Sequence, residues 1–294
     1  MTVQSAMTGL NKYNMLPGNR PYGEYVALVP RFDPEMTDII ARFISHRAEL
    51  AHARGAVVGI SGGLDSAVVA ALCRRALGKD KVLGLLMPDE RPSPEARMAV
   101  KWLGIESRLA PIGGLVKALL HAGPKGLSRG AIGNLKARTR MAILYMEANQ
   151  NGRLVVGTGN KSELLTGYFT KFGDGGADIL PIGDLYKTQV RELAAALGVP
   201  DKIQKLVPTA GLYPGQTDEG ELGMSYEYLD RILLGLELRL DRSEIANKTG
   251  VPLSEVERIA RRVEAGAHKR AVPAIPKLGI RTIGLDWREE SVGD

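Results

Sequence analysis

The residues best suited to chemistry form a short run of small and acidic side chains in the first quarter of the sequence. The run reads Gly59-Ile60-Ser61-Gly62-Gly63-Leu64-Asp65-Ser66. Gly62 and Gly63 permit backbone angles that other residues resist, so several amide N–H groups can turn toward one anion. Ser61 and Ser66 add hydroxyl donors. Together these residues predict a loop that binds phosphate.

Asp65 places a carboxylate where the phosphate is expected to bind. Two negative groups at one point need a cation between them, and Mg²⁺ takes carboxylate and phosphate oxygens together. No lysine follows the glycines, so the run is not a GxxxxGK[ST] loop. A pair of glycines alone would favour an ordinary strand-to-helix turn. The whole run instead favours a phosphate bound with magnesium.

A phosphate loop of this kind needs a strand before it and a helix after it. Val57, Val58 and Ile60 are β-branched and lack alternating polar partners, which suits a strand buried on both faces of a parallel sheet. An alanine-rich segment begins at Ala67 and stops at Gly78, as a helix with a glycine C-cap does. The loop then lies at the positive end of a helix, which favours anions.

Strand-like and helix-like segments alternate along the chain. Strands are expected at 82–87, near 108–112 and at 154–156, and helices at 93–103, 131–149, 187–197, 225–235, 242–248 and 255–265. This order predicts an α/β fold, a doubly wound, Rossmann-like parallel sheet with helices on both faces. If strand 154–156 is a neighbour of the first strand, Gly157-Thr158 lies beside the phosphate loop, where such sheets bind ligands.

Two helices are expected to show clear buried faces. The first begins at Asp33-Pro34, ends near Gly55, and is predicted to bury Met36, Ile39, Ile40, Phe43, Ile44 and Ala51. The helix at 131–149 follows a flexible loop at 123–130 and is predicted to bury Ile132, Leu135, Thr139, Ala142, Ile143 and Met146. Arg138 and Arg140 are expected to face solvent or anions.

The sequence predicts one domain over residues 1–294. Residues 1–33 contain prolines and glycines without periodicity and are expected to form an extended arm. Residues 207–223 are expected to form a mobile cover, and 267–294 a C-terminal segment.

The composition is that of an ordinary globular protein, with 44% apolar and 24% charged residues in 294. The sequence contains neither a run of about 18 apolar residues nor a signal-peptide pattern, so we expect no membrane span and a cytoplasmic location. The net charge of +6 is explained equally by nucleic acid and by anionic nucleotides. Cys73 is the single cysteine, which excludes CxxC zinc sites, and the four histidines are too scattered to form a ligand set.

Two segments imitate other functions. Residues 157–162 imitate a GxGxxG dinucleotide fingerprint, but the sixth residue is Ser and the following glycines and aromatics leave no room for the required helix and strand. Residues 243–263 imitate a DNA-reading helix-turn-helix. Glu255, Glu257 and Glu264 would face the phosphates there, so a structural pair of helices is favoured.

Several segments together resemble a known family in order and spacing. The SGGLDS run matches the pyrophosphate loop of the ATP pyrophosphatase superfamily. The remaining matching segments are Asn134–Met141, Gly157–Glu163, Gly167–Asp178, Leu185–Val190, Pro208–Ala210, Gln216–Gly223 and His268–Arg270. They resemble the ammonia-dependent NAD synthetase family over roughly residues 34–275. The resemblance implies an adenine nucleotide alpha hydrolase-like fold.

The resemblance also implies a reaction, a ligase step that forms a C–N bond. Deamido-NAD is converted to NAD through an adenylated intermediate, with ATP as co-substrate, Mg²⁺ as cofactor, and AMP and pyrophosphate as products. Glutamine-using members carry an amidohydrolase domain with a nucleophilic cysteine, for which Cys73 is unsuited. Free ammonia, or ammonia from a separate glutaminase, is therefore implied. Family members are homodimers, and neither nucleic acid nor a membrane is an expected partner.

Residue roles follow from the resemblance position by position. It implies that ATP is contacted by Gly59, Ile60, Ser61, Gly62, Gly63, Leu64, Asp65, Ser66, Thr158, Lys187 and Thr209. It implies that deamido-NAD is contacted by Arg138, Lys171, Asp178, His268 and Lys269. Asp65 and Glu163 are the implied magnesium ligands. We add Asp174 to the catalytic set of Asp65, Glu163 and Lys187, as a carboxylate to orient or deprotonate ammonium.

Two other functions stay open at this point. A tRNA-modifying enzyme can use the same loop, and although one cysteine argues against a thiolase, it does not argue against a lysidine-synthetase-like activity. A DNA-binding regulator using the 243–263 pair is the other alternative.

Overall fold

The computed structural model describes residues 28–213 and 215–283. The arm expected at 1–33 lies outside this part up to residue 27, as does the end of the C-terminal segment. Within the described residues no helix is both long and apolar enough to cross a membrane.

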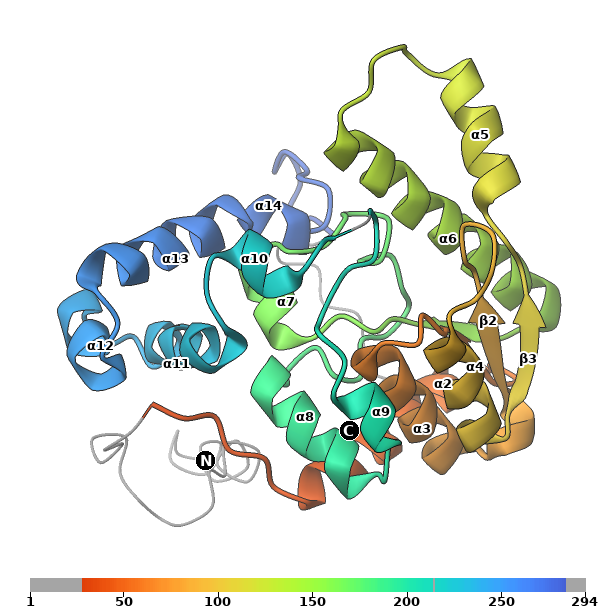
Figure 1. Ribbon diagram of the computed structural model, residues 1–294, viewed down its shortest axis with the longest axis horizontal. Coiled ribbons are helices and arrows are strands. Elements are labelled where there is room, and N and C mark those ends of the chain that lie inside the picture. The colour runs from red at the N-terminus through yellow and green to blue at the C-terminus, as the bar shows by residue number, and fades with distance from the viewer. Residues whose placement is uncertain (1–27, 214, 284–294) are drawn as a thin grey trace.

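Four parallel strands form the centre of the fold (Figure 1). They are β1 (Ala56–Gly59), β2 (Val82–Leu86), β3 (Glu106–Leu109) and β4 (Leu154–Val156), in the order β3-β2-β1-β4. Val58 of β1 pairs with Gly84 on one side and with Val156 on the other. The chain therefore winds outward from β1 in both directions, and the expected neighbourhood of β1 and β4 is confirmed.

Helices cover both faces of this sheet. One core joins β1, β2 and β4 to α2 (Glu35–Leu50), α3 (Leu64–Leu77), α4 (Pro94–Leu103) and α8 (Lys187–Ala196). A second core lies on the other face, beneath α5 (Gly113–Ala122) and α6 (Arg129–Asn151). The predicted doubly wound sheet with helices on both faces is confirmed.

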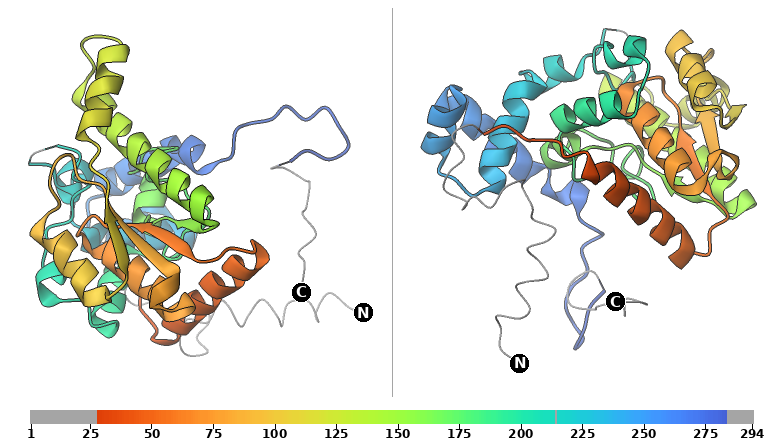
Figure 2. Two further views of the ribbon diagram at one scale, coloured as in Figure 1. Left: turned by 90° about the vertical axis from the view of Figure 1, so that its right-hand side faces the viewer. Right: turned by 90° about the horizontal axis from the view of Figure 1, so that it is seen from below.

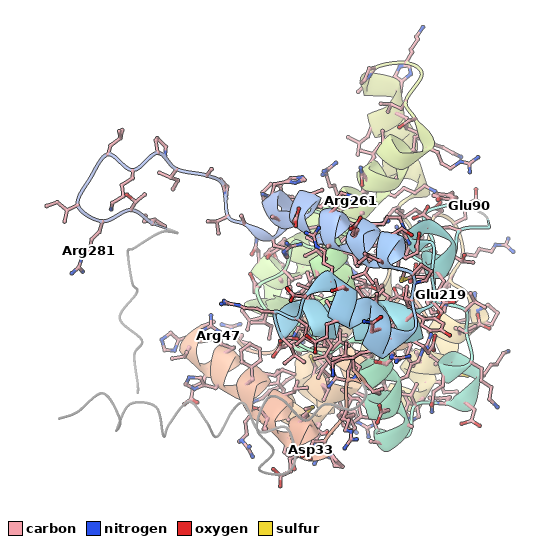
Figure 3. The ribbon with its side chains drawn as sticks, turned by 90° about the vertical axis from the view of Figure 1, so that its left-hand side faces the viewer. Asp33, Arg47, Glu90, Glu219, Arg261 and Arg281 are labelled. Carbon is pink, nitrogen blue, oxygen red and sulfur yellow. The ribbon has the colours of Figure 1, made fainter. Side chains whose placement is uncertain are left out.

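A third core lies beside the sheet layer and belongs to the second half of the chain. It is built from α11 (Tyr226–Glu237), α12 (Arg242–Thr249) and α13 (Leu253–Ala265), together with Leu28, Tyr186 and Leu222. Figure 3 views the molecule from the side of these three helices, which lie in front of the rest. The shorter helices are η1 (Lys79–Lys81), α7 (Lys161–Thr166), α9 (Asp201–Gln204), α10 (Asp218–Leu222) and α14 (Ala267–Arg270).

Residues beyond α14 extend away from the body of the molecule, as Figure 2 and the position of Arg281 in Figure 3 show. Leu278 and Ile280 on this segment are 91% and 94% exposed. The division of the chain that includes a C-terminal segment at 267–294 stays a prediction.

Several predicted boundaries and faces were wrong. Helix α5 was missed because glycines occupy its start and its end, and α2 ends at Leu50 rather than near Gly55. Ile39 and Phe43 are exposed, and so is Met146 of α6. Ile40 and Ile44 of α2 and Thr139 and Ile143 of α6 are buried as predicted. The other buried residues are Thr37, Ala41 and Ala48 in α2 and Gly133, Ala137, Glu147 and Ala148 in α6. Small side chains allow these helices to pack closely, which a pattern of large apolar residues does not reveal.

Cys73 gives a testable consequence of the packing of α3. Its side chain is fully buried, and burial raises the pKa of the thiol from 9.0 to about 12. Above pH 9.0 the unfolded thiol ionises while the folded one keeps its proton, so stability is lost as the pH rises toward 12. Between about pH 8 and 10 we expect the wild type to lose about 1.4 kcal/mol more unfolding free energy than Cys73→Ala.

Urea unfolding of both proteins at the two pH values measures this difference. A thiol reagent should label native Cys73 only as fast as the chain opens. Labelling at the rate of an unfolded peptide would contradict the burial of this side chain.

Candidate active site

A cavity of about 1170 Å³ opens at the carboxyl ends of β1, β2 and β4. It lies at the carboxyl ends of β1 and β4, where the strand order β3-β2-β1-β4 reverses direction, the switch point at which doubly wound sheets bind ligands. The complete run Gly59–Ser66 lines it. Its other walls come from α6, from α10, and from residues within 167–176 and 204–213.

The loop between β1 and α3 has the geometry of an anion site. Ser66 Oγ donates to the carbonyl oxygen of Gly63 at 2.9 Å, and Ser61 Oγ accepts from the Gly63 N–H at 3.1 Å. Gly62 has a φ of +92°, and a Cβ there would lie 2.6 Å from the backbone nitrogen of Ala96. Only glycine fits at that position. The first turn of α3, which begins at Leu64, therefore directs its free N–H groups at the cavity.

A buried ion pair lies at the mouth of this loop. Lys187 Nζ donates to Asp65 Oδ2 at 2.6 Å, and the Lys187 side chain is only 4% exposed. Asn160, which is fully buried, donates from Nδ2 to the same Asp65 oxygen at 3.2 Å. Asn160 also caps α7, since its Oδ1 accepts from the Glu163 N–H and its own N–H donates to Glu163 Oε2. Asn160 thus joins the two carboxylates expected to form a pair, binding Asp65 through its side-chain amide and the Glu163 carboxylate through its backbone N–H.

Burial and charge shift the pKa values of this cluster. Burial raises the pKa of Glu163 well above 4.5, and the charge of Asp65 raises it further. Burial alone would lower the pKa of Lys187, but the carboxylates of Asp65 and Glu163 outweigh it and raise that pKa. Burial also raises the pKa of Asp218, which the charge of Lys187 opposes. When Asp65, Glu163 and Asp218 are all ionised, one lysine leaves an excess of negative charge, and the charge of Asp65 adds to burial in raising the pKa values of Glu163 and Asp218.

The cluster suits a divalent cation that brings further ligands with it. Asp65 Oδ1 and Asp218 Oδ1 are buried without a hydrogen-bond partner in the part of the chain that the structure describes. Within that part, no group of three or more His, Cys, Asp or Glu residues is arranged to hold a metal ion. Asp65 and Glu163 can therefore supply two oxygens, and phosphate and water the others, as Mg²⁺ prefers.

The remaining residues predicted to contact ATP, which are Thr158, Lys187 and Thr209, all line the same cavity. Asp174, expected to act on ammonium, and Lys269, expected to contact deamido-NAD, line it too. Asp174 Oδ1 accepts from the Thr170 N–H at 2.9 Å, and burial raises the pKa of this carboxyl. Residues 207–213 of the expected cover line the cavity too. Whether this segment moves stays a prediction.

Four of the residues predicted to contact deamido-NAD do not line the cavity. Arg138 Nη2 donates to the Lys171 carbonyl oxygen, and Lys171 Nζ donates to the His268 carbonyl oxygen, so these three lie together outside it. Asp178 lies at the edge of β4, where its carboxylate accepts from Tyr145 Oη and from the Val155 N–H. The structure thus separates the buried cluster around Asp65 and Lys187 from an exposed polar group formed by these four residues.

The sequence missed three residues of this site. Asn160 could have been found, because Asn160 and Glu163 have the spacing of a capping box. Asp218 lies in a segment with family resemblance but was given no role. Arg140 was expected to face solvent or anions and instead donates to the Met87 carbonyl oxygen and to Asp89. Its partners lie about 50 residues away, and the sequence offers no local signal for them.

The segment 243–263, which imitates a DNA-reading helix-turn-helix, makes structural contacts. Arg258 and Arg262 of α13 donate to the carbonyl oxygens of Leu222 and Glu221. These guanidinium groups hold α10 against α13, which agrees with the expectation of a structural helical pair.

Comparison with known proteins identifies relatives over most of the chain. A family model described as NAD synthase matches residues 36–273. The NH(3)-dependent NAD(+) synthetase of Methanosarcina acetivorans is 47% identical over 246 residues, which covers 81% of this chain and 96% of that protein. The protein of the same name from Pyrococcus horikoshii is 47% identical over 233 residues, covering 78% and 91% of the two chains.

Solved structures are also similar to this chain over most of its length. The NMN synthetase of Francisella tularensis superposes with a TM-score of 0.74 at 35% identity, covering 84% of this chain and 100% of that chain. The NH3-dependent NAD synthetase of Campylobacter jejuni, in complex with the nitrate ion, has a TM-score of 0.72 at 31% identity with the same coverage.

Asn160 can be tested apart from catalysis. Asn160→Ala removes the cap of α7 and a donor to Asp65, so we expect it to lower the unfolding free energy by about 1–2 kcal/mol. Asn160→Asp keeps an oxygen for the Glu163 N–H but sets a carboxylate against Asp65, so it should cost more at neutral pH than the alanine variant. Urea unfolding without nucleotide measures both. A loss below about 0.5 kcal/mol for Asn160→Ala, the size of an ordinary surface effect, would contradict the bridging role.

Proposed function

The chain belongs to the NAD synthase family, and we propose that it joins ammonia to the nicotinate carboxylate of deamido-NAD in an ATP-dependent ligase reaction. The observation that carries the proposal is the meeting of Asp65, Glu163 and Lys187 at a phosphate loop within the matched region. The products are NAD, AMP and pyrophosphate. Neither tRNA modification nor DNA binding is supported by the relatives.

Activation of the carboxylate is the first chemical task, because a carboxylate is a poor electrophile. Its oxygen attacks the α-phosphorus of ATP, and pyrophosphate leaves into the loop Gly59–Ser66, where backbone N–H groups and the start of α3 hold it. Lys187, already buried at this point, offsets charge that develops between the α- and β-phosphates. Mg²⁺ held by Asp65 and Glu163 would supply further neutralisation of the phosphate oxygens.

Displacement of AMP by ammonia is the second task, and the attacking nitrogen must be neutral. Asp174 lines the cavity, and its raised pKa suits a group that accepts a proton from ammonium. Lys269 lines the same cavity and lowers the pKa of Asp174 through its charge, against the effect of burial. Ammonia as the nitrogen source is supported by the relatives named above and by the burial of Cys73, which makes it unsuitable as an amidohydrolase nucleophile.

We assign the binding of deamido-NAD to the exposed polar group and Lys269. Arg138, Lys171, His268, Lys269 and Asp178 are proposed to contact deamido-NAD, supported by the contacts that join Arg138, Lys171 and His268. Because Arg138, Lys171, His268 and Asp178 lie outside the cavity that Lys269 lines, a second copy of the chain would complete the site, so we propose a homodimer. We also propose a single catalytic domain and a cytoplasmic location.

The direct test supplies ATP, Mg²⁺, deamido-NAD and ammonium and follows NAD, AMP and pyrophosphate. We expect the three products in equal amounts and a kcat/KM at least about 100-fold lower for Asp65→Asn, because a metal ligand and the partner of Lys187 are lost together. Glu264→Gln, an exposed partner of Arg242, is the matched control and should leave the rate unchanged. NAD formation by the wild type no faster than by Asp65→Asn would overturn the proposal. The deamido form of NMN, tried in parallel, tests which substrate is preferred.

A further inference from the structure

Helix α11 carries two carboxylates that reach the same pair of helices. Asp230 and Glu237 are seven residues apart, about two helical turns, so they lie on one face of α11. Each carboxylate accepts a hydrogen bond from a side chain of α7. Each also accepts one from a residue at the start of α8. Neither lines the active-site cavity.

Asp230 is the inner contact and is fully buried. Its Oδ1 accepts from Ser162 Oγ at 2.5 Å, and its Oδ2 accepts from the Thr188 N–H at 2.8 Å and from Thr188 Oγ1 at 2.9 Å. Ser162 Oγ in turn accepts from the Lys187 N–H at 2.9 Å. The first two free N–H groups of α8 are therefore satisfied by α7 and α11 rather than by the segment that precedes α8.

Glu237 is the outer contact. Its Oε1 accepts from Lys161 Nζ at 2.7 Å, and its Oε2 accepts from Tyr186 Oη at 2.6 Å. Lys161 is the first residue of α7, and Tyr186 directly precedes α8. The Lys161 ammonium also lies 4.9 Å from the centre of the Tyr186 ring. About half of the Glu237 side chain is exposed, so its contacts restrain the two helices less than those of Asp230.

The residues held in this way are the chain neighbours of the charged groups in the site. Ser162 precedes Glu163, and Tyr186 and Thr188 flank Lys187. The distance between Glu163 and Lys187 therefore depends on how α7 and α8 are held against α11. An error of about 1 Å in such groups is enough to lower a rate strongly.

We propose that Asp230 and Glu237 are positioning residues that fix α7 against α8 and so place Glu163 and Lys187 for the ATP-dependent half of the reaction. This rests on the proposed function. An amide in place of Asp230 keeps the shape but turns an acceptor into a donor that faces the Thr188 N–H or the Ser162 hydroxyl. Both helix starts are then free to shift, while the ammonia side of the cavity, around Asp174, is untouched.

The experiment separates the two half-reactions in Asp230→Asn and Glu237→Gln. Rapid quenching without ammonium measures pyrophosphate release, and addition of ammonium to the preformed adenylate measures the second step. We expect Asp230→Asn to slow pyrophosphate release by about 10- to 100-fold, the range for groups that orient metal ligands, and Glu237→Gln to slow it less. The second step should change by less than about twofold in both. Glu264→Gln, on the neighbouring α13, is the acid-to-amide control and should change neither step.

Two outcomes overturn the inference: pyrophosphate release at the wild-type rate in Asp230→Asn, or equal slowing of both steps together with a lowered melting temperature, which indicates general destabilisation. If Asp230→Asn does not fold, Ser162→Ala and Thr188→Val each remove one contact and should slow the first step alone. Unchanged rates in both would then refute the inference.

Binding of Mn²⁺ with a non-hydrolysable ATP analogue, followed by electron paramagnetic resonance, does not depend on turnover. We expect it to be about 10- to 100-fold weaker in Asp230→Asn than in the wild type. If the wild type makes no NAD, the proposed function fails. This binding measurement still tests whether Asp230 positions Glu163 and Lys187. Equal binding in wild type and variant would refute it.

Discussion

The buried contact between Lys187 and Asp65 is the constraint on which the rest of the site depends. These residues are 122 positions apart, and their side chains meet at 2.6 Å with little exposure to water. A buried charge is costly to leave unpaired, so the two must be held at contact distance by the fold. β1 positions Asp65 through the loop that follows it, and the segment after β4 leads to α7 and α8. The neighbourhood of β1 and β4 is thus a requirement of the charge pair.

Helix ends explain why so many acids can lie together here. Asp65, Glu163 and Lys187 each occupy the first turn of a helix, namely α3, α7 and α8. The positive end of a helix stabilises a carboxylate but disfavours an ammonium. Lys187 is therefore stable at its position only because the acids surround it. The same helix ends are suited to phosphate, which would compete with the carboxylates for these N–H groups.

The sequence predicted the local features of this arrangement and missed those that depend on distant partners. The parallel sheet follows from β-branched runs, and the approach of Asp65 and Glu163 to one cavity follows from family spacing. That the loop holds phosphate and that the two carboxylates hold magnesium stay predictions. The exposure of Ile39 and Phe43 could not be predicted in this way. The periodicity of the sequence shows where large apolar residues recur, but not which small residues let α2 approach α3. Arg140 was misplaced because Met87 and Asp89 come from another strand end. Asn160 and Glu163 have the spacing of a capping box, a signal for a helix start that was not used and that could not have revealed the contact of Asn160 with Asp65.

The helices α11 to α13 show how a separate core can contribute to a site that it does not line. Their core includes Tyr186 and Leu222, which border α8 and α10, so packing alone would hold these elements near the cavity. Packing between apolar surfaces fixes position less specifically than hydrogen bonds do, and a buried carboxylate is often no more stabilising than an apolar residue of similar size. The burial of Asp230 is therefore poorly explained by stability. It is better explained by register, because its bonds to Ser162 and Thr188 specify one arrangement of α7 and α8, and with it one distance between Glu163 and Lys187.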